Sequence, residues 1–114
     1  MMRLLPTGLL LLAVLCPLAF PATQASAGPL IARGDRAFAP YEFIDAGGRP
    51  TGFNIELLEA IADRLEMDVD VGLEEGDAVM DAFSRGSVDI VTGMVRSAER
   101  ERQFDFSITH TGIF

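Results

Sequence analysis

The sequence predicts an α/β fold in which a mainly parallel sheet is flanked by helices. Apolar runs typical of strands alternate with two segments whose apolar residues recur at helical spacing, in the order strand, helix, strand, helix, strand. Helical segments that join one strand to the next are the connections that parallel strands require. The chain has 114 residues, which allows one domain.

The first strand is expected at residues 29–33, an apolar run that ends before Gly34. An irregular, aromatic-rich stretch follows over residues 35–44, and residues 45–52 form a turn region rich in glycine. An amphipathic helix comes next, with Asn54 as its expected N-cap. The apolar residues expected to form its inner face are Leu57, Leu58, Ile61 and Leu65.

Residues 67–73 alternate apolar and acidic side chains, which indicates a half-buried or edge strand. Asp77 is expected to cap a second helix, and Gly86 is expected to end it with a positive φ. The side chains expected to face inward from this helix are Val79, Met80 and Phe83.

Residues 87–94 predict a third strand, and Ser97 is expected to cap a short helical turn that runs through Arg102. Ligands of open parallel sheets bind beyond the carboxyl ends of the strands. Two loops, residues 34–41 and 93–100, leave those ends. We therefore expect a binding site between these two loops.

Residues 1–27 are typical of a secretory signal peptide. Arg3 precedes an apolar run over residues 9–20, and Ala25-Ser26-Ala27 forms a small-x-small cleavage site. A transmembrane anchor is the alternative, but this run is shorter than the ~20 residues that cross a bilayer. We expect the mature protein to comprise residues 28–114.

Charge is distributed unevenly along the chain. Residues 28–114 contain eight arginines and seventeen carboxylates, and hence a net charge of −9. Nucleic acids and anionic membranes bind cationic surfaces, so this acidity argues against both as partners.

Signals for catalysis are weak. Cys16, the only cysteine, would leave with the signal peptide, which removes disulfides, cysteine nucleophiles and thiolate metal sites. His110, the only histidine, has no second histidine or cysteine as a partner, and Gly47-Gly48 precede a turn rather than a helix. We therefore expect no enzyme activity, no cofactor and no metal site.

Three side chains in the two loops suit the binding of a small molecule. Arg100 can hold a carboxylate through two parallel hydrogen bonds. Asp35 can take an ammonium group, and Phe38 can stack on a ligand or face a cation. Each has a plainer alternative: Arg100 pairs with Asp105 or Glu101 at the surface, Asp35 caps its loop, and Phe38 packs in the core.

These residues lie in motifs that resemble those of the family-3 extracellular solute-binding proteins, in the family's order and spacing over about Leu30 to Phe114. The motifs are Gly34-Asp35 with Phe38-Ala39-Pro40-Tyr41-Glu42-Phe43, Gly52-Phe53-Asn54-Ile55-Glu56-Leu57 with Ala60-Ile61-Ala62, Gly86-Ser87-Val88-Asp89, Gly93-Met94, and Ser97-Ala98-Glu99-Arg100 followed by Phe104-Asp105-Phe106-Ser107.

The resemblance implies a periplasmic-binding-protein-like fold, in which two α/β lobes close by a hinge motion on a small ligand, usually an amino acid. Residues 28–114 would then be most of the first lobe, truncated, which alone would bind weakly or not at all. On the matching positions Arg100 would clamp the ligand carboxylate, Asp35 would contact an amino or side-chain group, Phe38 would form an aromatic wall, and Gly93 would offer a backbone contact.

The resemblance also implies a periplasmic location, a small-molecule ligand and a membrane permease or receptor as partner, in an ABC-type importer. Extracellular sensor domains of histidine kinases and of cyclic-dinucleotide signalling proteins are the alternative, and dehydratases are a third class. Three departures from the family pattern stand out. Val95 replaces a common serine or threonine, Arg96 adds a positive charge, and Thr109-His110 stands where proline and an aromatic are frequent.

Overall fold

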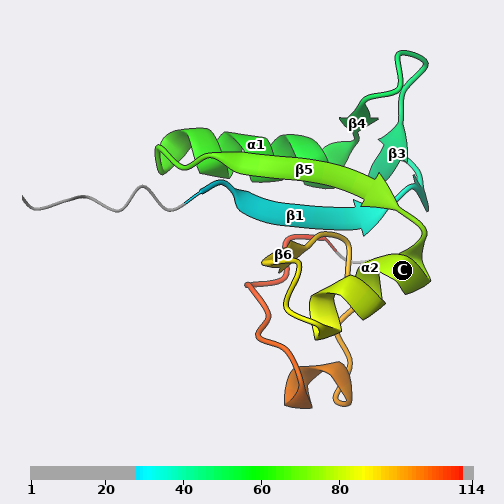
Figure 1. Cartoon of the computed structure of the whole chain (residues 1–114), viewed down its shortest axis with the longest axis vertical. Coiled ribbons are helices and arrows are strands. Elements are labelled where there is room, and N and C mark those ends of the chain that lie inside the picture. The colour runs from blue at the N-terminus through cyan, green and yellow to red at the C-terminus, as the bar shows by residue number, and fades with distance from the viewer. Residues whose placement is uncertain (1–27, 112–114) are drawn as a thin grey trace, which may run out of the picture.

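The structure, a computed structural model, describes residues 28–111. Its main sheet has three parallel strands in the order β5–β1–β6, which confirms the predicted α/β class. The central strand is β1 (Leu30–Asp35), and β5 (Val69–Glu74) and β6 (Ile90–Val91) lie on either side of it. Figure 1 shows β1 and β5 side by side and pointing the same way.

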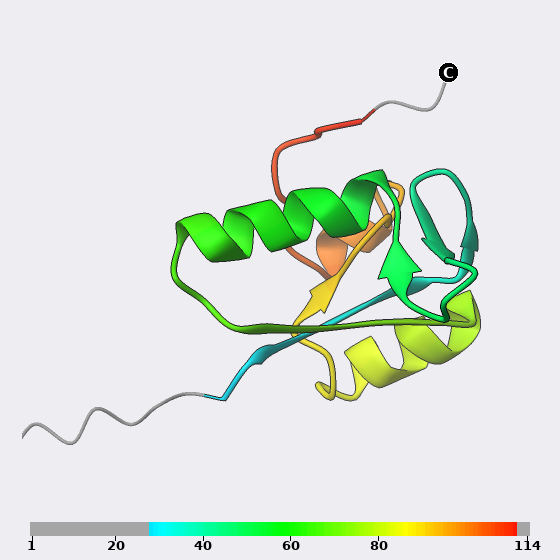
Figure 2. The same cartoon turned by 90° about the horizontal axis from the view of Figure 1, so that it is seen from above.

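The two helices cover opposite sides of this sheet. Helix α1 (Phe53–Arg64) leads into β5, and helix α2 (Gly76–Ser84) connects β5 to β6. Figure 2 shows the strands passing between the two helices. The buried apolar residues that join these layers are Ala32, Ile55, Ala62, Leu73, Val79 and Val88.

A second, small sheet stands beside the main one, where the sequence predicted an irregular stretch and a turn. Strands β2 (Ala37–Phe38), β3 (Glu42–Ile44) and β4 (Pro50–Thr51) pair in antiparallel fashion, with β3 in the middle. Strands of two or three residues are too short to display the alternation that identifies a strand in sequence.

Helix α1 begins differently from the prediction. Gly52, not Asn54, is its N-cap, and Asn54 is the second residue of the helix and is buried. The first amides of the helix donate to backbone carbonyls of the preceding loop, from Phe53 to Pro40 and from Asn54 to Tyr41. These bonds satisfy the free amide groups of the first turn, so no side-chain cap is needed.

The inner face of α1 is also rotated from the prediction. Ile61 and Leu65 are 47% and 61% exposed, whereas Ile55 and Ala62 are buried. The sequence pattern misled because apolar residues occur around much of the helix. Leu57 and Leu58, the other two residues of the predicted inner face, are half-buried.

Helix α2 agrees more closely with expectation. It starts two residues earlier, with Glu75 in place of Asp77 as N-cap, and Asp77 lies within its first turn. Val79 is buried and Met80 and Phe83 are half-buried, as the spacing predicted. Gly86 has a φ of 76°, which confirms the expected left-handed exit.

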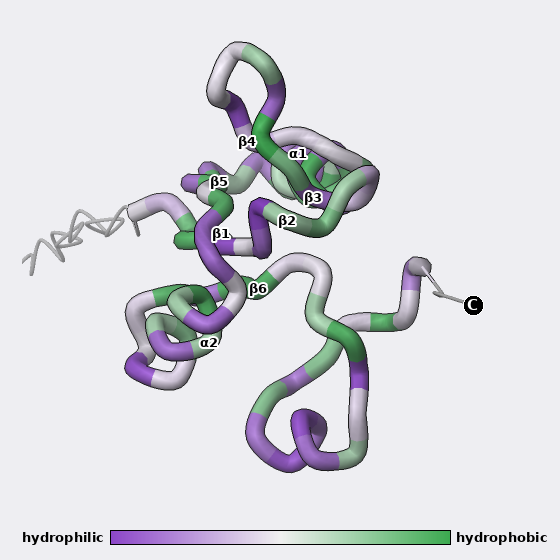
Figure 3. The backbone as a smooth tube through the Cα atoms, turned by 90° about the vertical axis from the view of Figure 1, so that its right-hand side faces the viewer, coloured by the Kyte–Doolittle hydropathy of each residue, from purple (hydrophilic) through white to green (hydrophobic). Residues whose placement is uncertain are grey.

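The third strand is shorter than predicted, because only residues 90–91 pair with β1. Beyond it the chain runs through an extended loop that projects from the rest of the fold (Figure 3). The 3₁₀ turn Arg100–Arg102 has Glu99 as its N-cap, not the predicted Ser97. Ser97 Oγ still accepts a hydrogen bond of 3.3 Å from the Arg100 amide.

The expected signal peptide, residues 1–27, and Cys16 lie outside the described residues. Within residues 28–111, neither helix has the length and apolar character needed to span a membrane.

Candidate functional site

A cleft of about 240 Å³ opens where β1 and β6 end. It lies between the loop after β1, the start of α2 and the segment that follows β6. All four residues that the sequence proposed for ligand binding line this cleft, together with eight others: Asp35, Phe38, Gly93 and Arg100, with Glu42, Gly76, Val79, Met80, Val91, Thr92, Met94 and Val95. The two strand-end loops therefore line the same cleft, and whether a ligand binds there stays a prediction.

Asp35 is the last residue of β1 and is half-buried. Its Oδ1 accepts a hydrogen bond of 2.9 Å from the Ala37 amide, so the carboxylate also caps its own loop. The other oxygen faces Gly76, where an added Cβ would lie 2.9 Å from Oδ2. Gly76 thus leaves room for this carboxylate at the mouth of the cleft.

Phe38 forms a side of the cleft and is half-buried. Its ring packs on Tyr41, with ring centroids 5.2 Å apart and planes tilted by 32°. The contact with Tyr41 and the placement of Phe38 in β2 together hold the ring at the wall of the cleft.

Arg100 reaches the cleft from the 3₁₀ turn. Its Nη1 donates to the Val95 carbonyl at 2.8 Å. A guanidinium has five N–H donors, and this bond uses one. The surface pairing with Glu101 considered from the sequence is made by Arg96 instead.

Gly93 follows β6 with a φ of 68°, in the left-handed region that glycine tolerates best. A Cβ at this position would overlap the Glu42 carboxylate. Close approach of the backbone to a buried side chain therefore requires glycine here, independently of any ligand.

Glu42 is the site residue for which the sequence analysis found no role. It is fully buried in β3, beneath the cleft, and its Oε2 accepts a 2.9 Å hydrogen bond from the Asp35 amide. Its Oε1 accepts a 2.8 Å hydrogen bond from Asn54 Nδ2. The only signal in the sequence was a carboxylate enclosed by aromatics, Tyr41 and Phe43, in a segment that did not look like a strand.

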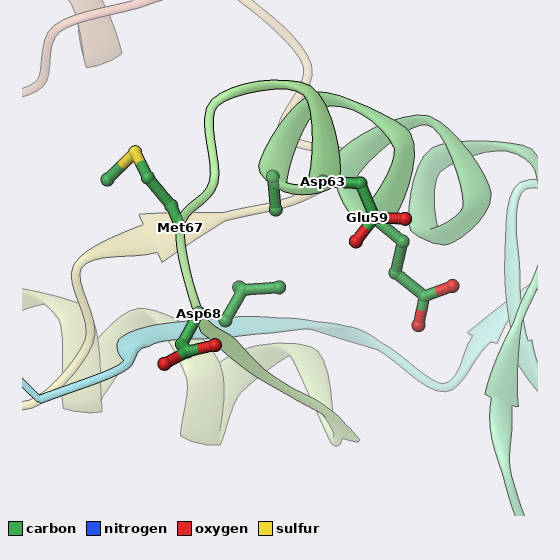
Figure 4. A pocket seen from close by; sticks show the side chains of 6 residues that line it. Glu59, Asp63, Met67 and Asp68 are labelled. Atoms are coloured by element: carbon green, nitrogen blue, oxygen red, sulfur yellow. The ribbon is translucent and has the colours of Figure 1, made fainter.

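A second hollow, of about 330 Å³, lies where α1 meets the start of β5. Figure 4 shows Glu59 and Asp63 on the helix and Met67 and Asp68 on the connection to β5. Across residues 28–111, no group of three or more histidine, cysteine or carboxylate side chains is arranged to hold a metal ion.

Residues 30–113 match the model of the bacterial extracellular solute-binding proteins, family 3. The chain belongs to this family.

Relatives of this family-3 domain include a probable histidine-binding protein of Neisseria gonorrhoeae, 31% identical over 61% of this chain and 26% of the relative. The structure of a histidine kinase sensor domain with similarity to periplasmic binding proteins is 40% identical, with a TM-score of 0.68, over 70% of this chain and 35% of that one. The arginine-bound form of domain 1 from TmArgBP is 29% identical, with a TM-score of 0.59, over 66% and 60% of the two chains.

The family-3 domain described here thus spans about a quarter of the Neisseria relative's length. Most of the matching proteins are named as binding proteins, and their structures share the periplasmic-binding-protein-like fold. A lytic murein transglycosylase and an ancestral cyclohexadienyl dehydratase also match, so the family includes enzymes.

Proposed function

We propose that this domain binds a small α-amino acid in the cleft at the ends of β1 and β6. Arg100 holds the ligand carboxylate and Asp35 takes an ammonium or other cationic group. Phe38 provides an aromatic wall, and Gly93 offers backbone contact.

The observation that carries this proposal is the convergence of opposite charges on one partly apolar cleft. Asp35 ends β1 and Arg100 follows β6, yet both line the same cavity with Phe38, Val79 and Met80. A zwitterionic ligand presents one group to each charge, and the apolar residues accommodate its carbon skeleton. The names of relatives, which include histidine-, arginine- and cystine-binding proteins, support an amino acid as the ligand.

Within the whole protein, we propose that the domain captures its ligand in the periplasm, after cleavage at residue 27, and delivers it to an ABC-type importer. A sensor role is the second candidate, favoured by the 40% identity to a histidine kinase sensor domain. An open reading frame that continues into a membrane helix and a kinase domain would support sensing. One that ends after a second lobe would support import.

Isothermal titration with L-arginine, L-histidine and L-cystine tests binding. Arg100→Ala should weaken the binding free energy of the ligand by about 2–5 kcal/mol, the loss typical of a desolvated pair between a guanidinium and a carboxylate. Arg102→Ala is the matched control, because Arg102 occupies the same 3₁₀ turn but does not line the cleft.

If Arg100→Ala and Arg102→Ala bind the ligand with equal affinity, Arg100 is not part of the binding site. The titration extends to millimolar ligand, because we expect one lobe alone to bind weakly. Domain 1 of TmArgBP nevertheless has an arginine-bound form.

A further inference from the structure

The buried carboxylate of Glu42 determines the direction of a chain of hydrogen bonds. Both Glu42 oxygens accept hydrogen bonds, Oε2 from the Asp35 amide and Oε1 from Asn54, so Asn54 turns its NH₂ group toward Glu42 Oε1. The Asn54 Oδ1 atom then faces the opposite way, toward His110 Nε2 at 3.3 Å. An amide oxygen only accepts, so Nε2 of His110 must carry the hydrogen.

We propose that His110 is a positioning residue for the cleft, acting through Asn54 and Glu42 on the backbone of Asp35. His110 donates to Asn54, Asn54 donates to Glu42, and the Asp35 amide donates to the other oxygen of Glu42. The chain links the segment after the 3₁₀ turn to the loop after β1. As a device for ligand binding, it rests on the proposed function above.

Packing around Glu42 allows it little freedom to compensate for a lost partner. A Cβ at either Gly34 or Gly93 would overlap its carboxylate, so the two glycines close on it from both sides. In residues 28–111, none of the ion pairs involves Glu42. The hydrogen bonds from Asp35 and Asn54 are therefore the polar contacts that hold the Glu42 carboxylate in place.

His110 is held at the other end by a second contact. Its ring stacks on Phe53, with centroids 6.2 Å apart and planes inclined by 26°. Phe53 and Asn54 are neighbours at the start of α1, so one residue fixes the plane of the imidazole and the next receives its hydrogen bond.

The tautomer of His110 is the direct readout. The chain has one histidine, so a ¹⁵N-histidine-labelled sample gives a single pair of ring-nitrogen signals. At a pH of about 8.5, where an ordinary imidazole is neutral, the wild-type protein should show mainly the Nε2–H tautomer.

Glu42→Gln should reverse the chain. The Gln carbonyl must accept from the Asp35 amide, which turns its NH₂ group toward Asn54. Asn54 then rotates to accept that bond and presents its own NH₂ group to His110. Nε2 must now accept, so the population should move toward the Nδ1–H tautomer.

The double variant Glu42→Gln/Asn54→Asp is the matched rescue, because it exchanges acid and amide without changing total charge or side-chain shape. Asp at position 54 accepts from both neighbours, so the Nε2–H tautomer should return. An unchanged tautomer in folded Glu42→Gln would overturn the proposal. If Glu42→Gln does not fold, the double variant decides. The proposal is overturned if the double variant also fails to fold, or if it folds without the Nε2–H tautomer.

Binding of L-arginine supplies the functional arm. We expect Glu42→Gln to weaken binding by about tenfold or more and the double variant to recover it within about threefold. If Glu42→Gln changes the tautomer of His110 but binds L-arginine as tightly as the wild-type protein does, the positioning role is overturned. Failure of the wild-type protein to bind L-arginine, L-histidine or L-cystine would instead count against the proposed function, and the tautomer result would still decide the hydrogen-bond chain.

Discussion

Asp45 shows how one side chain organises the turn between β3 and β4. Its Oδ1 accepts hydrogen bonds from the amides of Gly47 and Arg49, at 2.8 and 2.9 Å, and its Oδ2 contacts the Arg49 guanidinium. These bonds lower the pKa of Asp45 below its usual 3.8, with the Arg49 amide as the largest cause. Arg49 itself is 81% exposed, so its charge contributes little beyond these hydrogen bonds.

Acid should loosen this turn before it affects the sheet. The folded pKa of Asp45 is lower than its unfolded value, so its stabilising effect is complete above pH 3.8 and is lost as the pH falls through the folded value. We expect the Gly47 and Arg49 amide signals to move together below that pH in an NMR titration. In Asp45→Asn the Gly47 and Arg49 amide signals should no longer shift with pH. If they shift as in the wild-type protein, another carboxylate is responsible.

The site residues were predictable to the extent that they lie in strand-end loops. Asp35, Phe38, Gly93 and Arg100 meet because parallel strands bring their carboxyl ends to the same edge, and that rule needs only the order of elements. Glu42 escaped because its strand is three residues long and its partners come from β1 and α1.

At the scale of the element, the entry into α1 depends on the backbone of the preceding loop. Gly52 has φ 114° and ψ 170°, a conformation that glycine alone adopts readily. It allows the loop carbonyls of Pro40 and Tyr41 to reach the first amides of the helix. Sequence reasoning placed the cap at Asn54 because it considers side chains, and this cap is made by main-chain groups.

Replacing Gly52 should therefore cost more than replacing another left-handed glycine. Gly52→Ala adds a Cβ that overlaps the Tyr41 carbonyl, and we expect a loss of about 3–5 kcal/mol in the free energy of unfolding. Gly86→Ala is the control, because Gly86 has φ 76° but open space around it. Its loss should be about 1–2 kcal/mol. Equal losses in urea denaturation would contradict the steric explanation.

For the whole molecule, β1 is the strand on which the rest of the fold depends. It pairs with β5 along its full length and with β6 near its middle. Asp89 adds a further link, since its Oδ2 accepts a 2.8 Å hydrogen bond from the Ile31 amide. The parallel direction of the strands was predictable from the alternation of strands and helices, because helical connections join parallel strands. The order was not, since α2 joins β5 to β6 and yet β1 lies between these two strands.

Hydrogen exchange should reveal this centrality. The amides of Ala32 and Arg33 lie between two neighbouring strands, whereas the hairpin of β3 and β4 can open without disturbing them. We expect the β1 amides to exchange at least about tenfold more slowly than that of Ile44. Simultaneous exchange of all three amides would mean that the two sheets unfold as one unit.

The central position of β1 has a consequence for biosynthesis. Among the strands of residues 28–111, β1 is made first, and the Ile31 amide must find a carboxylate 58 residues further along the chain. At about 5–20 residues per second on the ribosome, those 58 residues take about 3–12 s to follow. Throughout that interval the nascent strand has an unpaired edge. The earliest segment of this fold to be synthesised is therefore also among the last to be completed.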